Sequence, residues 1–315
     1  MDAPAERTFD RLGPVLTKKR LALQEASAAH LLHQGEGLLR LERWIPLDRT
    51  ILTLLALVGL AGPARREFLG IRLVEQTWTL AHLPAAFDGF RLLQLSDLHL
   101  DIDPELSPAI VRAVQNVPHD AAVVTGDFRN RTDGDPAPCI ALLSDVLPFL
   151  AKDRWGILGN HDSLEMTQPI EAAGLPILLN ESAALTRCDA KLWICGTDDP
   201  HFFRTHDLEA ASRGIPSGDC KILLTHSPEI FDEAEQAGFD LQLSGHTHGG
   251  QLCLPGGFPL VVPCRAPRRF ARGRWSHGRL QGYTSPGTGS CGVAARLFCP
   301  PEITLHTLRS PSAGV

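Results

Sequence analysis

The stretch FRLLQLSDLH, residues 90–99, decides how the rest of the chain is interpreted. An apolar run ends abruptly in a polar tail that carries Asp97 and His99. Later stretches repeat this design, each an apolar run that ends in Gly, Asp, His or Asn: AAVVTGD (121–127), WGILGN (155–160), KLWICG (191–196), KILLTH (221–226) and LQLSGH (241–246). Runs that are apolar on both faces predict strands of a covered sheet. Because α/β folds keep their sites at the carboxyl ends of strands, we expect the polar tails to form one site.

The segments between these runs carry helix signals, which together with the strands predicts an α/β domain. Ser107-Pro108 predicts a helix start, with the serine as N-cap and the proline as first helical residue. Ser227-Pro228 predicts a second start, and Gly238 predicts the end of that helix. Residues 252–301 are rich in Gly and Pro and predict long loops with two late strands.

The composition of the 315 residues agrees with a globular protein and narrows the function classes. Hydrophobic residues make up 43% and charged residues 21%, a balance that argues against global disorder. The formal net charge of −6 argues against a general nucleic-acid binder, which usually has a basic balance. The eight cysteines form no C-x-x-C pair, so no zinc ribbon or redox motif is indicated. The sequence also lacks a P-loop and a G-x-S-x-G elbow, which leaves NTPase and serine hydrolase functions unsupported.

The N-terminal segment, residues 1–70, is predicted to be helical and separate from a domain over residues 71–315. Residues 1–50 are rich in Ala, Leu and charge, and residues 51–62 (ILTLLALVGLAG) form the most apolar run, with arginines on both sides. Such a run spans about 18 Å as a helix, short of the roughly 30 Å hydrocarbon layer. Two interpretations stay open, a helix that covers the domain or a shallow anchor at a membrane surface. We expect a cytoplasmic protein, with the inner face of the cell membrane as a second location.

Polar clusters stand at the ends of the predicted strands: Asp97-x-His99, Gly126-Asp127, Gly159-Asn160-His161-Asp162, Thr225-His226 and Gly245-His246-Thr247-His248. Each is a weak signal alone, because a single histidine at a strand end is more often structural. Together they supply two aspartates, one asparagine and four histidines that can bind metal, with a further histidine left over. Two divalent ions need about this many nitrogen and oxygen donors.

The residue types in these clusters also suit a pair of metal ions. A carboxylate such as that of Asp127 can bridge two ions about 3.5–4 Å apart. A glycine before each donor lets the backbone turn sharply at the strand end. No sulfur donor falls in the series, which favours Mn, Fe, Zn or Mg.

In this order, the blocks SDLH, TGD, GNHD, LTH and SGHTH resemble the calcineurin-like metallophosphoesterases. The family's blocks are D-x-H, G-D, G-N-H-D/E, H and G-H-x-H. The resemblance covers about residues 72–309, including the late strand PPEITLHTL, and is more narrowly to the bacterial branch with a membrane-proximal N-terminal segment. It implies a four-layer αββα sandwich of two mixed sheets, with a di-metal site at the strand ends.

The resemblance also implies a role for each matching residue. One metal ion would be held by Asp97, His99 and His248, the other by Asn160, His226 and His246, and Asp127 would bridge both. His161 would be the catalytic residue that faces the substrate, where it stabilises phosphoryl charge or protonates the leaving oxygen. Asp162 either orients the site or is a plain turn residue.

The chain departs from the family pattern on the substrate side. Many relatives follow G-D with x-x-D-R, but here Asn130-Arg131 stands in that place and carries no negative charge to assist His161. The late loop TSPGTG lacks the arginine that relatives often carry before its second glycine. His201, Arg204 and Arg131 are predicted to bind substrate.

Residues 265–279 carry six arginines and no acidic residue in a chain that is acidic overall. One interpretation is a solvated loop. The other is attraction of an anionic substrate or of lipid headgroups.

These observations predict a di-metal phosphoester hydrolase, a phosphodiesterase or phosphatase in which a metal-bridging hydroxide attacks phosphorus. Its cofactors would be two divalent ions, Mn, Fe, Zn or Mg, and its partner a phosphoester substrate, with no nucleic-acid partner indicated. One alternative is a lipid-linked pyrophosphatase, such as a UDP-diacylglucosamine hydrolase, that works at a membrane surface. Another is a non-catalytic binding member of the fold, although none of the expected ligands is missing. The sequence does not choose the substrate or the oligomeric state.

Overall fold

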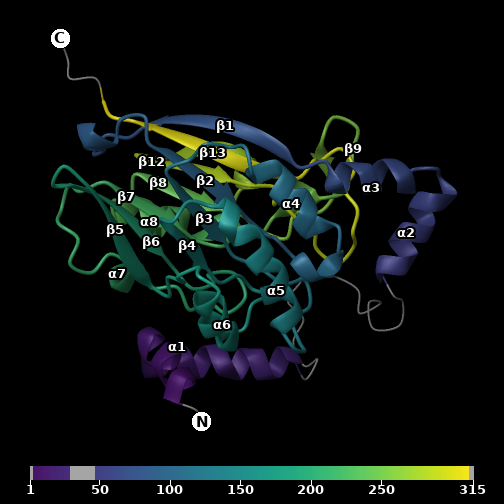
Figure 1. Cartoon of the computed structure of the whole chain (residues 1–315), viewed down its shortest axis with the longest axis horizontal. Coiled ribbons are helices and arrows are strands. Elements are labelled where there is room, and N and C mark those ends of the chain that lie inside the picture. The colour runs from purple at the N-terminus through teal and green to yellow at the C-terminus, as the bar shows by residue number, and fades with distance from the viewer. Residues whose placement is uncertain (1–2, 29–46, 312–315) are drawn as a thin grey trace.

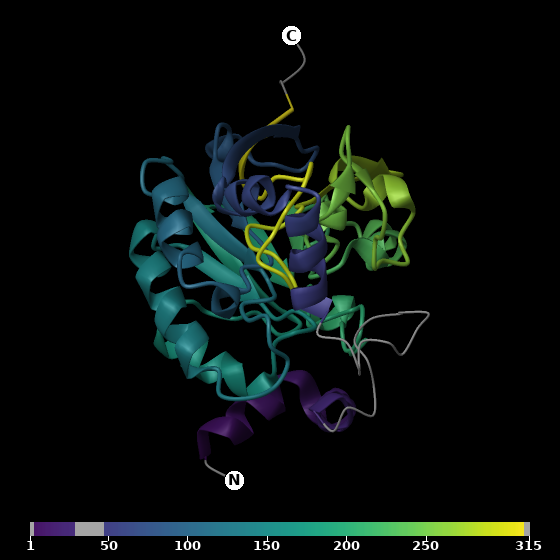
Figure 2. The same cartoon turned by 90° about the vertical axis from the view of Figure 1, so that its right-hand side faces the viewer.

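Two β-sheets pack face to face, with helices on their outer faces, in the computed structural model, which describes residues 3–28 and 47–311 (Figure 1, Figure 2). The first sheet has the order β1-β13-β2-β3-β4, formed by β1 (Arg72–Thr79), β13 (Glu302–Arg309), β2 (Arg91–Leu95), β3 (Ala121–Thr125) and β4 (Arg154–Ile157). The second has the order β11-β12-β8-β7-β6-β5, formed by β11 (Gly273–His277), β12 (Leu280–Thr284), β8 (Leu241–Ser244), β7 (Lys221–Leu224), β6 (Ala190–Gly196) and β5 (Glu181–Arg187).

Both sheets are mixed, as expected. Strands β2, β3 and β4 run parallel in the first sheet, and β6, β7, β8 and β12 run parallel in the second. Antiparallel pairs join β13 to β2, β5 to β6 and β11 to β12. The strands predicted from the apolar runs are therefore confirmed.

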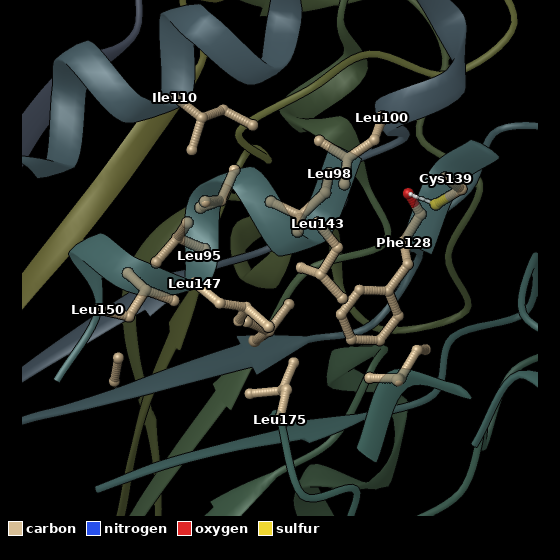
Figure 3. Close-up of a cluster of buried hydrophobic side chains, with 14 of the residues drawn as sticks. Leu95, Leu98, Leu100, Ile110, Phe128, Cys139, Leu143, Leu147, Leu150 and Leu175 are labelled. Carbon is tan, nitrogen blue, oxygen red and sulfur yellow. Dashed lines mark hydrogen bonds between the residues drawn. The ribbon is translucent and has the colours of Figure 1, made fainter. Parts of the chain in front are cut away.

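Side chains alternate along the strands between an inner core and two outer ones. Leu92 packs with Leu243 between the sheets, whereas Leu93 packs under the helices that cover the first sheet. Those helices are α4 (Leu106–Val114), α5 (Ala137–Val146) and α6 (Thr167–Ala172). Figure 3 shows Ile110 of α4 and Leu143 of α5 in one cluster with Leu95 of β2. The outer face of the second sheet is covered by α7 (Leu208–Ala211) and α8 (Phe231–Gln236). Burying each leucine contributes about 1.5–3 kcal/mol, so the four-layer order αββα is stabilised by three apolar cores.

One of the two predicted helix starts and the late loops differ in detail from the expectation, whereas a helical turn begins at Pro228 after Ser227 as expected. Helix α4 begins at Leu106, and Ser107 lies inside it, where its hydroxyl donates to the carbonyl of Leu142. The hydroxyl does not cap the helix, because it is buried against α5 and hydrogen-bonded there. Residues 252–301 hold four strands instead of two, since β9 (Cys253–Leu254) and β10 (Phe258–Pro259) form an additional short hairpin.

The N-terminal segment folds into α1 (Ala3–Ala28), α2 (Leu47–Leu57) and α3 (Ala61–Leu69), and residues 29–46 lie outside the described part. The apolar run 51–62 is divided between α2 and α3. Among the described residues, the helices are too short or too polar to cross a bilayer. Helix α1 packs on the domain, where Arg11 forms ion pairs with Glu171 and Glu181.

Candidate metal centre

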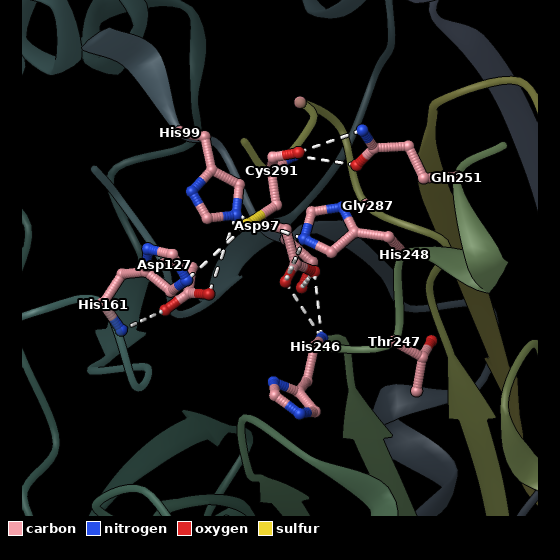
Figure 4. Close-up of polar contacts among 12 residues, drawn as sticks. Asp97, His99, Asp127, His161, His246, Thr247, His248, Gln251, Gly287 and Cys291 are labelled. Carbon is pink, nitrogen blue, oxygen red and sulfur yellow. Dashed lines mark hydrogen bonds and ion pairs between the residues drawn. The ribbon is translucent and has the colours of Figure 1, made fainter. Parts of the chain in front are cut away.

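The strand-end clusters lie on loops at one edge of the two sheets. These loops follow β2, β3 and β4 of the first sheet and β7 and β8 of the second. The imidazole Nδ1 of His226, after β7, donates to the carbonyl of Thr125 in β3 over 2.9 Å, which joins the two sheets at this edge. Figure 4 shows His99, Asp97, Asp127 and His248 gathered in one place.

Ring nitrogens without a proton converge on Asn160. A carbonyl oxygen only accepts, so His226 carries its proton on Nδ1 toward Thr125, and His246 carries its own on Nε2, 2.7 Å from the carbonyl of Pro263. In the neutral rings, the opposite nitrogens then point lone pairs at Asn160 Oδ1, 3.0 Å from His226 and 2.9 Å from His246. The two nitrogens lie 3.3 Å apart. Acceptor atoms this close favour a positive charge among them, either a proton on a ring, as the raised pKa of His226 indicates, or a metal ion, and this nitrogen and oxygen donor set fits a metal ion.

A second group of ligand-type atoms adjoins the first. Nδ1 of His99 donates to a backbone carbonyl over 2.8 Å, which leaves a lone pair on Nε2 of the neutral ring. That nitrogen lies 3.2 Å from Nε2 of His248 and 3.6 Å from Oδ2 of Asp127. Nε2 of His248 lies 3.6 Å from Oδ1 of Asp97. Because Oδ2 of Asp127 is also 3.3 Å from Nε2 of His226, one carboxylate touches both groups.

The clustered residues themselves adopt the left-handed backbone conformation. The angle φ is 51° at Asp97, 42° at His99, 56° at Asp127, 70° at His246 and 50° at His248. Such conformations cost of order 1–3 kcal/mol each in residues other than glycine, and they persist at sites where the surroundings fix them. The fold therefore stores backbone strain at this edge.

The glycines before these residues serve mainly to leave space. Gly126 has a left-handed backbone, with φ of 88°. A Cβ on Gly159 would lie 2.2 Å from Oδ1 of Asp127, and one on Gly245 would lie 1.9 Å from Oγ of Ser96. At Gly159 and Gly245, the close approach of neighbouring loops is therefore a further reason for glycine.

Asp162 orients the site, which decides between the two interpretations of this residue. Its carboxylate accepts from the backbone N–H groups of Asp127 at 2.8 Å, Phe128 at 2.9 Å and Gly159 at 2.9 Å. It thereby ties the loop after β3 to the loop after β4. Burial, with the neighbouring Asp127 carboxylate, raises the pKa of Asp162 to about 6.

His161 is oriented by a backbone carbonyl instead of a carboxylate. Its Nδ1 lies 2.6 Å from the carbonyl oxygen of Asn130, and its backbone N–H donates to Oδ1 of Asp127 over 2.8 Å. Its Nε2 lies 3.7 Å from Sγ of Cys291. Burial would lower the pKa of His161, but Asp127, the thiol and the carbonyl together raise it well above its usual value. A protonated ring suits a position that meets phosphoryl charge.

The pKa values of the two groups of ligand atoms indicate that the centre favours a bound positive charge. Burial lowers the pKa of His226, but the Asp127 carboxylate outweighs it and raises that pKa to about 10. Burial raises the pKa of Asp97 to about 6, and Asp127 adds to this. The pKa of Asp127 is held well below its usual value despite burial, because His226, His161 and His99 surround it.

Of the three residues expected to bind substrate, the structure brings His201 to the centre. Its ring centroid lies 4.0 Å from that of His246, and its Nδ1 lies 2.8 Å from a carboxylate oxygen of Glu229. Arg204 and Arg131 have exposed side chains, and Arg131 lies 3.8 Å from Asp133. The substrate roles of these residues stay predictions.

A polar cavity of about 230 Å³ opens beside His161. Asn160 and His161 line it from the centre, and Gln24 and Glu25 line it from α1. Helix α1 therefore forms a wall of the approach to His161. No pattern in the sequence predicts this wall, because α1 carries no motif of the family.

Cys291 lies in the centre although the sequence analysis did not single it out. Its Sγ and the ligand nitrogens of His99 and His248 all lie within 4.8 Å of one another. The strand-end series contains no sulfur, but the late loop TSPGTGSCG brings one to the same place. The glycines of that loop were the available signal, because they permit close approach to a site.

Comparison with known proteins agrees with this centre. The family model of calcineurin-like phosphoesterases matches residues 90–250. The uncharacterized metallophosphoesterase YkuE of Bacillus subtilis is 29% identical over 253 residues, which cover 76% of this chain and 86% of the relative. Phosphodiesterase YaeI of Escherichia coli is 30% identical over 234 residues, 70% of this chain and 82% of the relative. A transmembrane protein with metallophosphoesterase domain from Danio rerio is 29% identical over 322 aligned positions, 96% of this chain and 68% of the relative.

The matched residues begin at the strand that leads to Asp97 and end just beyond His248, so they contain all the strand-end clusters. The bacterial relatives extend the likeness over most of both chains. The chain therefore belongs to the calcineurin-like phosphoesterase family and is a metal-dependent phosphoester hydrolase.

Proposed function

We propose that the strand-end residues hold two divalent metal ions. One ion would be held by Asp97, His99 and His248, the other by Asn160, His226 and His246, with Asp127 between them. The observation that carries the proposal is the cluster of lone pairs around Asn160 Oδ1, where His226 Nε2 and His246 Nδ1 face the same oxygen. A cation resolves this repulsion, and Mn, Fe, Zn and Mg all accept such nitrogen and oxygen donors.

The reaction we propose is hydrolysis of a phosphodiester or phosphomonoester without a covalent enzyme intermediate. Two bound ions would supply a hydroxide nucleophile near neutral pH and would neutralise charge on the phosphoryl oxygens. The chain's own part is positioning and charge. Asp162 fixes the two loops that carry Asp127 and Asn160, and cationic His161 stabilises phosphoryl charge or gives a proton to the leaving oxygen. The name of the Escherichia coli relative favours phosphodiesters.

Assays on small soluble esters test this function. Protein loaded with Mn²⁺ should hydrolyse bis-p-nitrophenyl phosphate, with p-nitrophenyl phosphate as the monoester comparison. His226→Ala should lose both activity and bound metal. His82→Ala is the matched control, because His82 is 47% exposed and pairs with Asp240 away from the centre. Failure of the wild-type protein to cleave either ester while it holds metal would overturn the proposed hydrolysis.

An apolar cavity beside the centre favours a second candidate, a lipid-linked substrate such as UDP-diacylglucosamine. The cavity has a volume of about 440 Å³, and its apolar lining residues are Ile51, Leu252, Leu260, Val261 and Val293. Cys291, which contacts His161, also lines it. An alkyl chain in this cavity would therefore lie next to a phosphate at the centre. Hydrolysis of UDP-diacylglucosamine, compared with bis-p-nitrophenyl phosphate under the same conditions, tests this candidate.

We also propose that α2 brings the protein to the cytoplasmic face of a membrane, with residue 70 as the boundary between the N-terminal segment and the domain. Leu54 and Leu57 on α2 are 58% and 77% exposed, beside the apolar cavity that Ile51 of the same helix lines. Sedimentation with anionic vesicles should recover the wild-type protein. The double variant Leu54→Asp/Leu57→Asp should stay in the supernatant, whereas Val15→Asp, on a residue 77% exposed on α1, should sediment normally. Equal sedimentation of all three would refute a membrane role for α2.

A further inference from the structure

We infer that the sulfur of Cys291 is a ligand of the metal ion that Asp97, His99 and His248 would hold. The inference rests on the proposed two-ion centre and adds to it a donor from the late loop. That loop lies outside the strand-end clusters and outside the matched residues 90–250.

The distances fit coordination. With bonds of about 2.0–2.1 Å to nitrogen and 2.3 Å to sulfur, two donors on one tetrahedral ion lie roughly 3.3–3.6 Å apart. Nε2 of His99 and Nε2 of His248 are 3.2 Å apart already. Sγ of Cys291 and one ring nitrogen of each histidine all lie within 4.8 Å of one another, so a shift of at most about 1.5 Å would complete the geometry. Figure 4 shows the sulfur on the side of the ring of His99 that faces the centre.

The backbone around Cys291 is held in place from two sides. Gln251, three residues after His248, accepts from the backbone N–H of Cys291 at 2.8 Å and donates to its carbonyl at 3.0 Å, as Figure 4 shows. The next residue, Gly292, donates its N–H to Oδ1 of Asn130 over 2.8 Å. Asn130 in turn orients His161. The thiol is therefore carried by a loop that is fixed to the metal-binding turn and to the catalytic histidine.

A sulfur ligand changes which metal the centre prefers. Thiolate is a soft donor that suits zinc and iron better than magnesium or manganese. With Cys291, the group formed by Asp97, His99 and His248 offers one sulfur, two imidazoles and carboxylate oxygen. The group around Asn160 has no proposed sulfur donor. We therefore expect two unlike positions, with zinc or iron favoured at the first. On binding, the thiol proton would leave to solvent and the sulfur lone pair would form the bond to the ion.

Cobalt substitution tests the inference without any activity measurement. Metal-free protein would be titrated with Co²⁺ to two equivalents, and the near-ultraviolet absorption would be recorded. A thiolate ligand produces an intense charge-transfer band there. We expect the band in the wild type and in Cys264→Ser, a control on a half-buried thiol that contacts Ser227. Cys291→Ser should lack the band and should bind Zn²⁺ about tenfold or more weakly.

A second measurement needs no variant. Iodoacetamide labelling followed by peptide mapping should modify Cys291 in metal-free protein and spare it after Zn²⁺ loading. Equal labelling in both states, or two bound cobalt ions without a thiolate band, would overturn the role of Cys291 and leave the two-ion centre standing. Failure to bind cobalt at all would instead overturn the centre itself.

Discussion

The proposed roles of Asp127 and His161 differ, so we expect their variants to differ in metal content. Asp127 touches both groups of ligand atoms, at 3.6 Å from His99 and 3.3 Å from His226. Asp127→Asn should therefore remove nearly all activity and lower the bound metal, because the bridging charge is lost. Metal analysis and a bis-p-nitrophenyl phosphate assay check both effects.

His161 should behave differently because it is not among the seven proposed ligands: its Nδ1 is hydrogen-bonded to the backbone carbonyl of Asn130, and its Nε2 lies 3.7 Å from Sγ of Cys291. His161→Ala should lower turnover by about 10²–10⁴-fold, as expected for a general acid. Its metal content should stay close to that of the wild type. An empty site in His161→Ala would mean that this histidine is a ligand.

For single residues, the sequence could predict which side chains belong to the site but not all the groups that contact them. The five blocks identified Asp97, Asp127 and the histidines because their chemistry and order are specific. Asn130 was correctly expected to bring no charge, yet its backbone carbonyl orients His161. Every residue has such a carbonyl, so no sequence pattern marks the one that will be used. Cys291 was missed because it lies outside the strand-end clusters, and only the folded structure places its loop beside the centre.

Helix α1 is held to the domain by the buried side chain of Arg20. Arg20 is fully buried, with Nε 3.2 Å from Oδ2 of buried Asp198 and its guanidinium carbon 3.3 Å from the ring centroid of Phe203. Its Nη2 donates to the carbonyl of Asp162 over 2.9 Å. The sequence showed only a basic cluster at this point, because a partner 178 positions away (198 − 20) cannot be seen in a local pattern.

Arg20→Ala should lower the free energy of unfolding by about 3–5 kcal/mol, because it leaves the Asp198 carboxylate buried without its partner. Urea denaturation measures this. Lys18→Ala, on an exposed neighbour, should change stability by no more than about 0.5 kcal/mol. The pair Arg20→Met/Asp198→Asn should recover part of the loss. An unchanged midpoint in Arg20→Ala would show that α1 does not depend on this ion pair.

The strands were the elements best predicted from the sequence, because a run that is apolar on both faces has few alternatives. Of the two predicted helix starts, Ser227-Pro228 begins the helical turn Pro228–Ile230 as expected, whereas Ser107 lies inside α4 with its hydroxyl in a tertiary hydrogen bond. The apolar run 51–62 could not be assigned from the sequence, and the structure divides it between two helices. Local capping rules fail where packing offers a hydroxyl a better partner.

For the whole molecule, the arginines of residues 265–279 add a charged surface next to the centre. The carbonyl of Pro263, just before this run, accepts from His246, and Arg268, Arg269 and Arg272 are exposed. Replacing these three by Gln should raise KM for an anionic lipid substrate and weaken its salt dependence. A screened field fades beyond roughly 8–10 Å, so turnover on a small soluble diester should barely change. Arg279→Gln is the control at the far end of the run.

If KM and its salt dependence stay the same for every anionic substrate tried, the run is a solvated surface. The structure already assigns part of it to the fold, because Arg274 lies on β11 with its guanidinium carbon 4.1 Å from the ring centroid of Trp78. Net charge and composition excluded whole classes of function but could not separate these roles. Only the structure shows which arginines pack against the sheet and which are exposed near the centre.

Seven side chains from loops of both sheets are proposed to hold two metal ions (Asp97, His99, Asp127, Asn160, His226, His246 and His248). Elemental analysis of the purified wild-type chain, after growth or dialysis with ample divalent metal, tests this proposal most directly. The proposed centre predicts close to two ions per chain, and clearly fewer in Asp127→Asn. A stable value near zero in the wild type under these conditions would contradict it.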